Sequence, residues 1–267
     1  MLKLIRALFP LHILFLGCGG LEYSPNQVFS GDSPRNINRN SINRLNEEQG
    51  DARIRFILTG DSQRAYKDSK DLIEAINKLP EIDFVILNGD IADFGLYQEM
   101  ESVNQIFSKL SSPYIGVIGN HDLVANGERV YKHMFGELNF SFVYQGVKFI
   151  CHNTNSRESS FNGNVPDLAW LKQQFSPETG VDAYIAIAHV PPDDADFDES
   201  LATEYVNTIN NSSNTLAALF AHTHNHRVFY PGFQKDTPYI ITDPIEKRKF
   251  VLIEILDGKL KYEIISY

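Results

Sequence analysis

Short apolar runs alternate with amphipathic stretches from residue 53 onward, which is typical of strands alternating with helices. The pattern predicts strands over 54–58, 84–87 and 114–118, separated by helices over 71–79 and 100–110. In each helix the apolar residues recur at helical spacing and therefore share one face. This β-α-β-α-β order favours a parallel sheet, in which functional side chains gather beyond the carboxyl ends of the strands.

Further strands follow in the carboxyl-terminal half, so residues 53–267 are predicted to form one α/β domain. Strands over 140–144 and 147–151 are joined by Gln145 and Gly146, a pair typical of a two-residue hairpin turn. Asp257 and Gly258 predict a second such turn near the end of the chain. The remaining strands are predicted over 183–188, 215–220, 239–242, 250–256 and 260–265.

The first 18 residues differ in character from the rest of the chain. Lys3 and Arg6 are followed by the apolar stretch 7–16, which is too short to span a bilayer and is typical of an export signal. Gly17 and Cys18 resemble the lipobox of bacterial lipoproteins, whose cysteine is lipidated and becomes the first residue. We therefore predict a signal peptide over 1–17 and an exported lipoprotein, anchored through Cys18 on the periplasmic or outer surface. The alternatives are an ordinary cleaved signal or a buried amino-terminal helix.

Residues 19–51 are rich in Asn, Ser, Arg, Gly and Pro and show neither a helical nor a strand period. Such a composition buries too little apolar surface to offset the entropy lost on ordering. We therefore predict a flexible linker over 18–52, between the lipidated cysteine and the folded domain.

The charge balance is strongly acidic. The whole chain has a net charge of −10, and removal of 1–17 leaves 22 basic residues against 34 acidic ones, a net charge of −12. Such a surface repels polyanions, which argues against duplex nucleic acid or an anionic lipid face as the main partner.

Cys151 has no partner within the chain if Cys18 carries lipid, and it is predicted to be a small buried hydrophobe.

Oxygen and imidazole side chains follow five of the predicted strands. They are Asp61 and Gln63 after the first strand, Asp90 after the second, Asn120, His121 and Asp122 after the third, His189 after 183–188, and His222 and His224 after 215–220. Gly60, Gly89 and Gly119 would allow the tight turns just beyond the strands. Because parallel neighbours bring their carboxyl ends to one edge of a sheet, we expect these side chains to converge.

The order of these residues along the chain resembles that of the motifs of the calcineurin-like metallophosphoesterase family. Its five blocks are Asp-x-His, Gly-Asp, Gly-Asn-His-(Asp/Glu), a lone His and Gly-His-x-His, and they are matched in order between about residue 54 and residue 224. The resemblance implies a four-layer αββα sandwich of two mixed sheets flanked by helices. It also implies hydrolysis of a phosphomonoester or phosphodiester by a hydroxide bound to two divalent metal ions, with a small phosphate ester as the substrate.

The resemblance also implies a role for each residue. The first metal would be held by Asp61, Gln63 and His224, the second by Asn120, His189 and His222, and Asp90 would bridge the two. A bridging carboxylate holds two cations about 3.5–4 Å apart, where both can act on one phosphate group. His121 and Asp122 are the catalytic candidates: His121 would protonate the leaving oxygen, and Asp122 would orient His121 or a metal ligand.

Two residues depart from the family pattern. Gln63 stands where the first block has histidine, and its amide oxygen could bind a hard cation or hydrogen-bond a metal-bound water. The first metal would then be held less tightly, with a preference shifted from zinc toward manganese, iron or magnesium. Ala221 replaces the glycine before His222, a change that is tolerated if the backbone φ there is negative.

Several readings stay open from the sequence. A surface binding protein with weak or lost catalysis on the same fold is the main rival, and Gln63 is the only feature that favours it. A metallohydrolase acting on a bond other than a phosphate ester is the weaker rival. The acidic run 193–199 could form a rim that disfavours highly anionic substrates, although acids at the start of a helix over 201–209 are the favoured reading. The substrate, the metals and the oligomeric state are undetermined.

Overall fold

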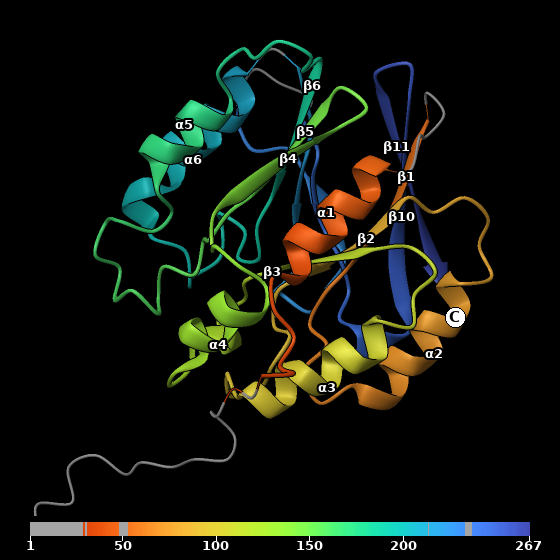
Figure 1. Cartoon of the computed structure of the whole chain (residues 1–267). Coiled ribbons are helices and arrows are strands. Elements are labelled where there is room, and N and C mark those ends of the chain that lie inside the picture. Colours follow the sequence, from red (N-terminus) through yellow and green to blue (C-terminus); the bar gives the residue numbers. More distant parts are fainter. Residues whose placement is uncertain (1–28, 30, 48–52, 213, 233–236) are drawn as a thin grey trace, which may run out of the picture.

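Two mixed β-sheets face each other in the computed structural model, which describes residues 29, 31–47, 53–212, 214–232 and 237–267 (Figure 1). The first sheet has the order β11 (Lys259–Ser266), β10 (Lys249–Leu256), β1 (Ile54–Thr59), β2 (Phe84–Asn88), β3 (Tyr114–Val117). The second has the order β4 (Phe140–Tyr144), β5 (Val147–Cys151), β6 (Ala183–Ile187), β7 (Thr215–Phe220), β9 (Tyr239–Ile241), β8 (Arg227–Phe229).

Helices cover the outer faces of both sheets (Figure 1). The first sheet packs its outer apolar residues against α2 (Tyr66–Ile76), α3 (Tyr97–Phe107) and α4 (Gly127–Met134). The second packs against α5 (Leu168–Gln174) and α6 (Glu199–Asn211). The inner faces meet in a third apolar layer, in which Phe84 lies 4.9 Å from Phe56 and 5.2 Å from Phe149 between ring centroids. This arrangement confirms the predicted αββα sandwich.

The strand directions place the predicted site at one edge of the sandwich. In the first sheet β1, β2 and β3 are parallel, and in the second β5, β6, β7 and β9 are parallel. The edge strands β4 and β8 and the hairpin of β10 and β11 run antiparallel to their neighbours. Both predicted hairpin turns are present, with positive φ at Gln145, Gly146, Asp257 and Gly258.

The prediction of a flexible linker is wrong for residues 37–47, which form α1 (Ile37–Glu47). The buried Asn38 side chain donates to the Gly116 carbonyl at 2.8 Å and accepts from the Gly116 amide at 2.8 Å. Leu45 is buried in the layer between the sheets. The helix therefore covers the free edge of β3 through an asparagine that imitates a strand backbone, a role that apolar periodicity does not reveal.

The predicted signal peptide over 1–17 and the lipidated Cys18 lie outside the described residues. Within the described ranges, no helix is both long and apolar enough to cross a membrane. Cys151 is fully buried in β5, as predicted, and burial raises the pKa of its thiol well above the usual range.

Candidate metal centre

The carboxyl ends of strands from both sheets meet at one edge of the sandwich. β1, β2 and β3 deliver Asp61, Asp90 and Asn120, and β6 and β7 deliver the histidines. The sheets are joined there by Asn88, whose side chain donates to the Ala188 carbonyl at 2.8 Å. The Asn88 carbonyl lies 2.8 Å from Nδ1 of His189, which directs the Nε2 atom of that ring toward the carboxylates. The expected convergence of the five strand ends is therefore present.

The turns beyond the strands have unusual backbone conformations. Four of the predicted ligands have φ between 52° and 66°, a region that residues other than glycine seldom occupy. They are Asp61, Asp90, His222 and His224. Such conformations persist only where the surrounding structure imposes them, and they cluster at functional sites.

The glycines of these turns serve two different needs. Gly89 has φ of 82°, as the turn prediction requires. Gly60 and Gly119 do not have positive φ, and they are needed for a different reason. A Cβ at Gly119 would lie 2.0 Å from the amide nitrogen of Asp90, and one at Gly60 would lie 2.9 Å from the Asn88 carbonyl oxygen. These two glycines are needed because the neighbouring loops pass too close for any side chain.

Two groups of ligand atoms share one carboxylate. In the first group, atoms of Asp61, Asp90 and His224 lie within 4.8 Å of one another. In the second, atoms of Asp90, His189 and His222 do the same. Asn120 belongs with the second group, since its Oδ1 lies 3.0 Å from Nδ1 of His222. This is the arrangement expected for two cations bridged by Asp90.

The buried donors at this centre are suited to cations. Both carboxylate oxygens of Asp61 and the Nε2 atom of His189 are buried without a hydrogen-bond partner among the residues that the structure describes. Leaving such groups unpaired in the interior is costly, and native proteins seldom do so without a ligand or ion. Among the described contacts of Asp61 with histidines, the shorter is with Nε2 of His224, at 3.4 Å. Carboxylate, imidazole and amide oxygen donors together fit divalent cations.

The two departures from the family pattern are both accommodated. The Gln63 side chain donates to Oδ2 of Asp90 at 3.1 Å, and its buried Oε1 atom has no hydrogen-bond partner within the described ranges. Gln63 thus contacts the carboxylate that both groups share and keeps an oxygen free for a cation or a water. Ala221 is fully buried and has no positive φ, so the condition stated for its tolerance is met.

Charges at the centre are strongly coupled. Burial lowers the pKa of His189, but the negative charge of Asp90, whose Oδ1 lies 3.3 Å from Nε2, together with the Asp61 charge, outweighs it and raises this pKa to about 10. Burial raises the pKa of Asp90, and the charge of His189 prevails and lowers it to about 2. The pKa of His222 is lowered, first by burial and then by the charge of His189. Without metal, a proton on His189 therefore balances the shared carboxylate.

Cation binding is expected to release this proton. A cation can bind Nε2 of His189 only after the nitrogen is deprotonated. The apparent affinity for the cation should therefore rise at least about tenfold per pH unit between about pH 6.5 and 8. Without metal, the same group contributes stability that is complete below its unfolded pKa of about 6.5 and is lost as pH rises through about 10. Titration calorimetry with Mn²⁺ in buffers of different ionisation enthalpy measures the release. An affinity independent of pH would contradict this prediction.

His121 lies beside the shared carboxylate without joining either group. Its backbone amide donates to Oδ1 of Asp90 at 3.0 Å, and its side chain is 41% exposed. Nδ1 of the ring lies 2.9 Å from the Asp93 carbonyl and 3.7 Å from the Asp93 carboxylate. Arg64 holds that carboxylate with a 2.6 Å hydrogen bond. The ring is therefore oriented so that its other nitrogen, Nε2, is available to a substrate.

Asp93 was missed from the sequence, and of the two roles predicted for Asp122 the described contacts do not include orientation of the His121 ring. Asp93 follows the same strand as Asp90 and lies three residues beyond it. That position could have indicated from the sequence that Asp93 lies near the centre. Asp122 is fully buried, accepting from the Ala92 amide at 2.7 Å and the Gly119 amide at 2.9 Å. It thus ties the loop of Asp90 to the loop of Asn120. Among the described interactions it has none with the ring of His121, so the role of orienting that ring belongs to Asp93.

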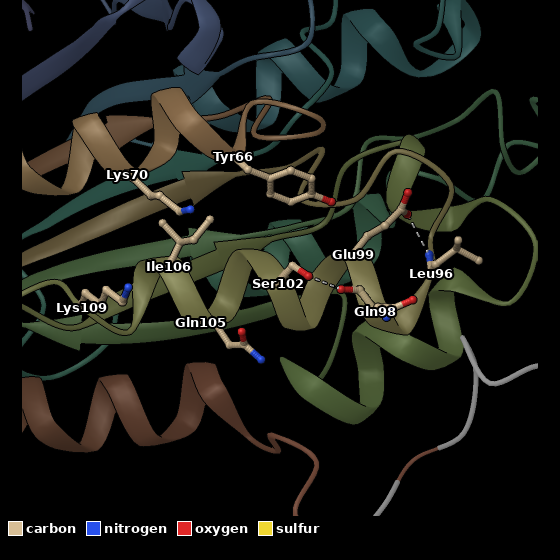
Figure 2. Close-up of a pocket in the computed structure, with 9 residues that line it drawn as sticks. All are labelled: Tyr66, Lys70, Leu96, Gln98, Glu99, Ser102, Gln105, Ile106 and Lys109. Atoms are coloured by element: carbon tan, nitrogen blue, oxygen red, sulfur yellow. Dashed lines mark hydrogen bonds between the residues drawn. The ribbon is translucent and has the colours of Figure 1, made fainter.

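A separate groove of about 670 Å³ lies between α2 and α3 (Figure 2). Tyr66, Lys70 and Lys109 line it, and none of its lining residues is a predicted site residue. The Glu99 carboxylate at its rim accepts hydrogen bonds from the amides of Phe94 and Leu96, at 2.9 and 3.2 Å. The Glu99 carboxylate therefore caps the amino terminus of α3. The candidate metal ligands lie elsewhere, at the carboxyl ends of the strands.

Comparison with known proteins agrees with this geometry. A probable cyclic nucleotide phosphodiesterase of Xenorhabdus bovienii (strain SS-2004) is 41% identical over 59 residues, 21% of this chain and 23% of that protein. Sphingomyelin phosphodiesterase 1 of Caenorhabditis elegans is 31% identical over 111 residues, 39% of this chain and 20% of that protein. The chain therefore spans about a fifth of the length of each of these curated relatives.

The fold is also that of a solved structure, a dimetal phosphatase from Danio rerio. The TM-score is 0.64 at 12% identity, with 80% of this chain and 99% of that one covered. Residues 54–226, more than half of the chain, match the family described as calcineurin-like phosphoesterase. The matched residues include every predicted ligand, from Asp61 to His224. The chain belongs to the calcineurin-like phosphoesterase family.

Proposed function

We propose that this protein hydrolyses phosphodiesters in a reaction that depends on two divalent cations. The observation that carries the proposal is the pair of ligand groups that share Asp90, with buried oxygen and nitrogen atoms that have no hydrogen-bond partner in the described part of the chain. The family match supports the phosphoesterase class.

The residues present define the two cation positions. Asp61, Asp90 and His224 would hold one cation, with Gln63 beside it, and Asp90, Asn120, His189 and His222 would hold the other. When bound, such a pair of cations supplies Lewis acidity, which stabilises the charge that grows on phosphate oxygens and lowers the pKa of coordinated water. The candidate cations are Mn, Fe, Mg and Zn.

The chain itself provides the proton transfer. The His121 side chain is partly exposed, and the Asp93 carbonyl accepts the hydrogen on Nδ1. The doubly protonated ring would donate from Nε2 to the departing oxygen, while Nδ1 stays beside the Asp93 carbonyl and 3.7 Å from the Asp93 carboxylate. Arg64 keeps the Asp93 carboxylate in place through its guanidinium. The hydrogen bond from the His121 backbone amide to Oδ1 of Asp90 holds His121 beside the shared carboxylate.

Charge around the centre favours a diester over a monoester. A phosphodiester carries one negative charge, whereas a monoester approaches two at neutral pH. The carboxylates of Asp194 and Asp196 lie 3.5 Å from His222, so additional substrate charge is disfavoured next to the second group. Both curated relatives named above are also phosphodiesterases by name.

The test compares a diester with a monoester that has the same leaving group. After chelation and dialysis, the protein is assayed with bis(p-nitrophenyl) phosphate and p-nitrophenyl phosphate, without metal and with Mn²⁺, Fe²⁺, Mg²⁺ or Zn²⁺. We expect activity only with added metal and kcat/KM at least about tenfold higher for the diester, a preference of about 1.4 kcal/mol. A preference for the monoester would refute the diester assignment. Absence of turnover with every metal would favour the binding-protein alternative.

A further inference from the structure

An acidic loop between β6 and α6 reaches the second ligand group. Its carboxylates at Asp194 and Asp196 each lie 3.5 Å from Nε2 of His222. The other nitrogen of that ring, Nδ1, lies 3.0 Å from Oδ1 of Asn120, another predicted ligand of the same cation. His222 is therefore held between the centre on one side and two carboxylates on the other.

The loop is itself braced in this position. Arg157 donates to both carboxylate oxygens of Asp196, at 2.8 and 3.0 Å, and its backbone amide donates to the Asp196 carbonyl. The Asp196 amide donates to Oδ1 of Asp194 at 2.9 Å. These bonds fix the two carboxylates relative to each other, so their shared approach to His222 is not an accident of exposed side chains.

The acids of this loop divide into distinct roles. Asp193 forms a two-bond ion pair with Arg227, at 2.7 Å for each bond, away from His222. Asp198 accepts from the Ser200 amide at 3.0 Å and caps the start of α6, which confirms the helix-start interpretation for that residue. Only Asp194 and Asp196 face the ligand histidine among the described ion pairs of His222.

Resting on the function proposed above, we propose that Asp194 and Asp196 are positioning residues for His222. A neutral imidazole carries one hydrogen, and two carboxylates that face Nε2 keep the hydrogen on that atom. The lone pair is then left on Nδ1, on the side of Asn120 and the second cation. Carboxylates behind a ligand histidine also increase its basicity, and their loss typically weakens metal binding by about 10- to 100-fold.

The experiment measures binding of Mn²⁺ by titration calorimetry and by electron paramagnetic resonance, without reference to turnover. The variants are Asp194→Asn alone and together with Asp196→Asn. Asp193→Asn is the matched control, because it removes the same charge from the same loop and touches Arg227 instead of His222. We expect Asp194→Asn and the double variant to weaken the second ion by about 10- to 100-fold, with the first ion and the Asp193→Asn control nearly unchanged. Circular dichroism establishes that each variant is folded.

Four results would overturn the inference, and they are distinguishable. Equal weakening by Asp193→Asn and Asp194→Asn would assign the effect to net charge alone. Three ions on the wild-type protein, with one lost in Asp194→Asn, would make Asp194, Asp196 and His222 a cation site of their own. Fewer than two ions on the wild-type protein would overturn the proposed function as well, whereas two ions unaffected by both variants would overturn only the positioning role.

Discussion

Asp90→Asn is expected to reduce phosphate-ester hydrolysis by at least about a thousandfold, since it removes the charge that both cation positions share and with it several kcal/mol of transition-state stabilisation. Asp90 belongs to both ligand groups, and it also accepts hydrogen bonds from Gln63 and from the His121 amide. An amide at this position is uncharged and presents one oxygen instead of two. The change therefore weakens both cations and the link to His121 together.

The measurement combines turnover with a count of bound metal. Wild-type protein is expected to retain two ions per chain after gel filtration, and Asp90→Asn fewer than one. Asp257→Asn provides a matched control, because it makes the same chemical change in the exposed turn between β10 and β11, where asparagine is tolerated at positive φ. Retained turnover in folded Asp90→Asn, as judged by circular dichroism, would contradict the assignment of the shared carboxylate.

His121→Ala is expected to reduce hydrolysis by about 10²- to 10⁴-fold for esters whose leaving group needs a proton. The side chain is partly exposed beside the centre, and Asp93 orients it, so its removal takes away the proton donor without removing a predicted ligand. For p-nitrophenyl esters the loss should be much smaller, because nitrophenolate departs readily without protonation. Asp93→Asn should show the same dependence on the leaving group with a smaller loss.

A series of phenyl phosphodiesters with leaving groups of increasing basicity tests this directly. The slope of log kcat against leaving-group pKa should be steeper for His121→Ala than for the wild-type protein. Metal content measured on the same preparations should be unchanged, which separates proton donation from loss of a cation. An equal loss for all leaving groups would show that His121 acts by stabilising the phosphate rather than by protonating the departing oxygen.

The elements that local patterning predicts well are those whose own residues carry the signal. The strands β2 and β3 are fully buried and almost wholly apolar, because both faces of the first sheet are covered. The helix α1 was missed because its stability comes from Leu45 and from the pairing of Asn38 with Gly116, 78 residues away. A contact of that kind leaves no period in the local sequence.

The chain alone determined the ligand types and their order, because each candidate follows directly from a strand and parallel strands must end at a common edge. Only the tertiary structure decided the finer partners. It showed Asp93, and not Asp122, beside the ring of His121, and it placed Asp194 and Asp196 behind His222. The physical reason is that the strands fix where each loop begins. The direction of each side chain in a loop depends instead on packing against other loops that are distant in sequence.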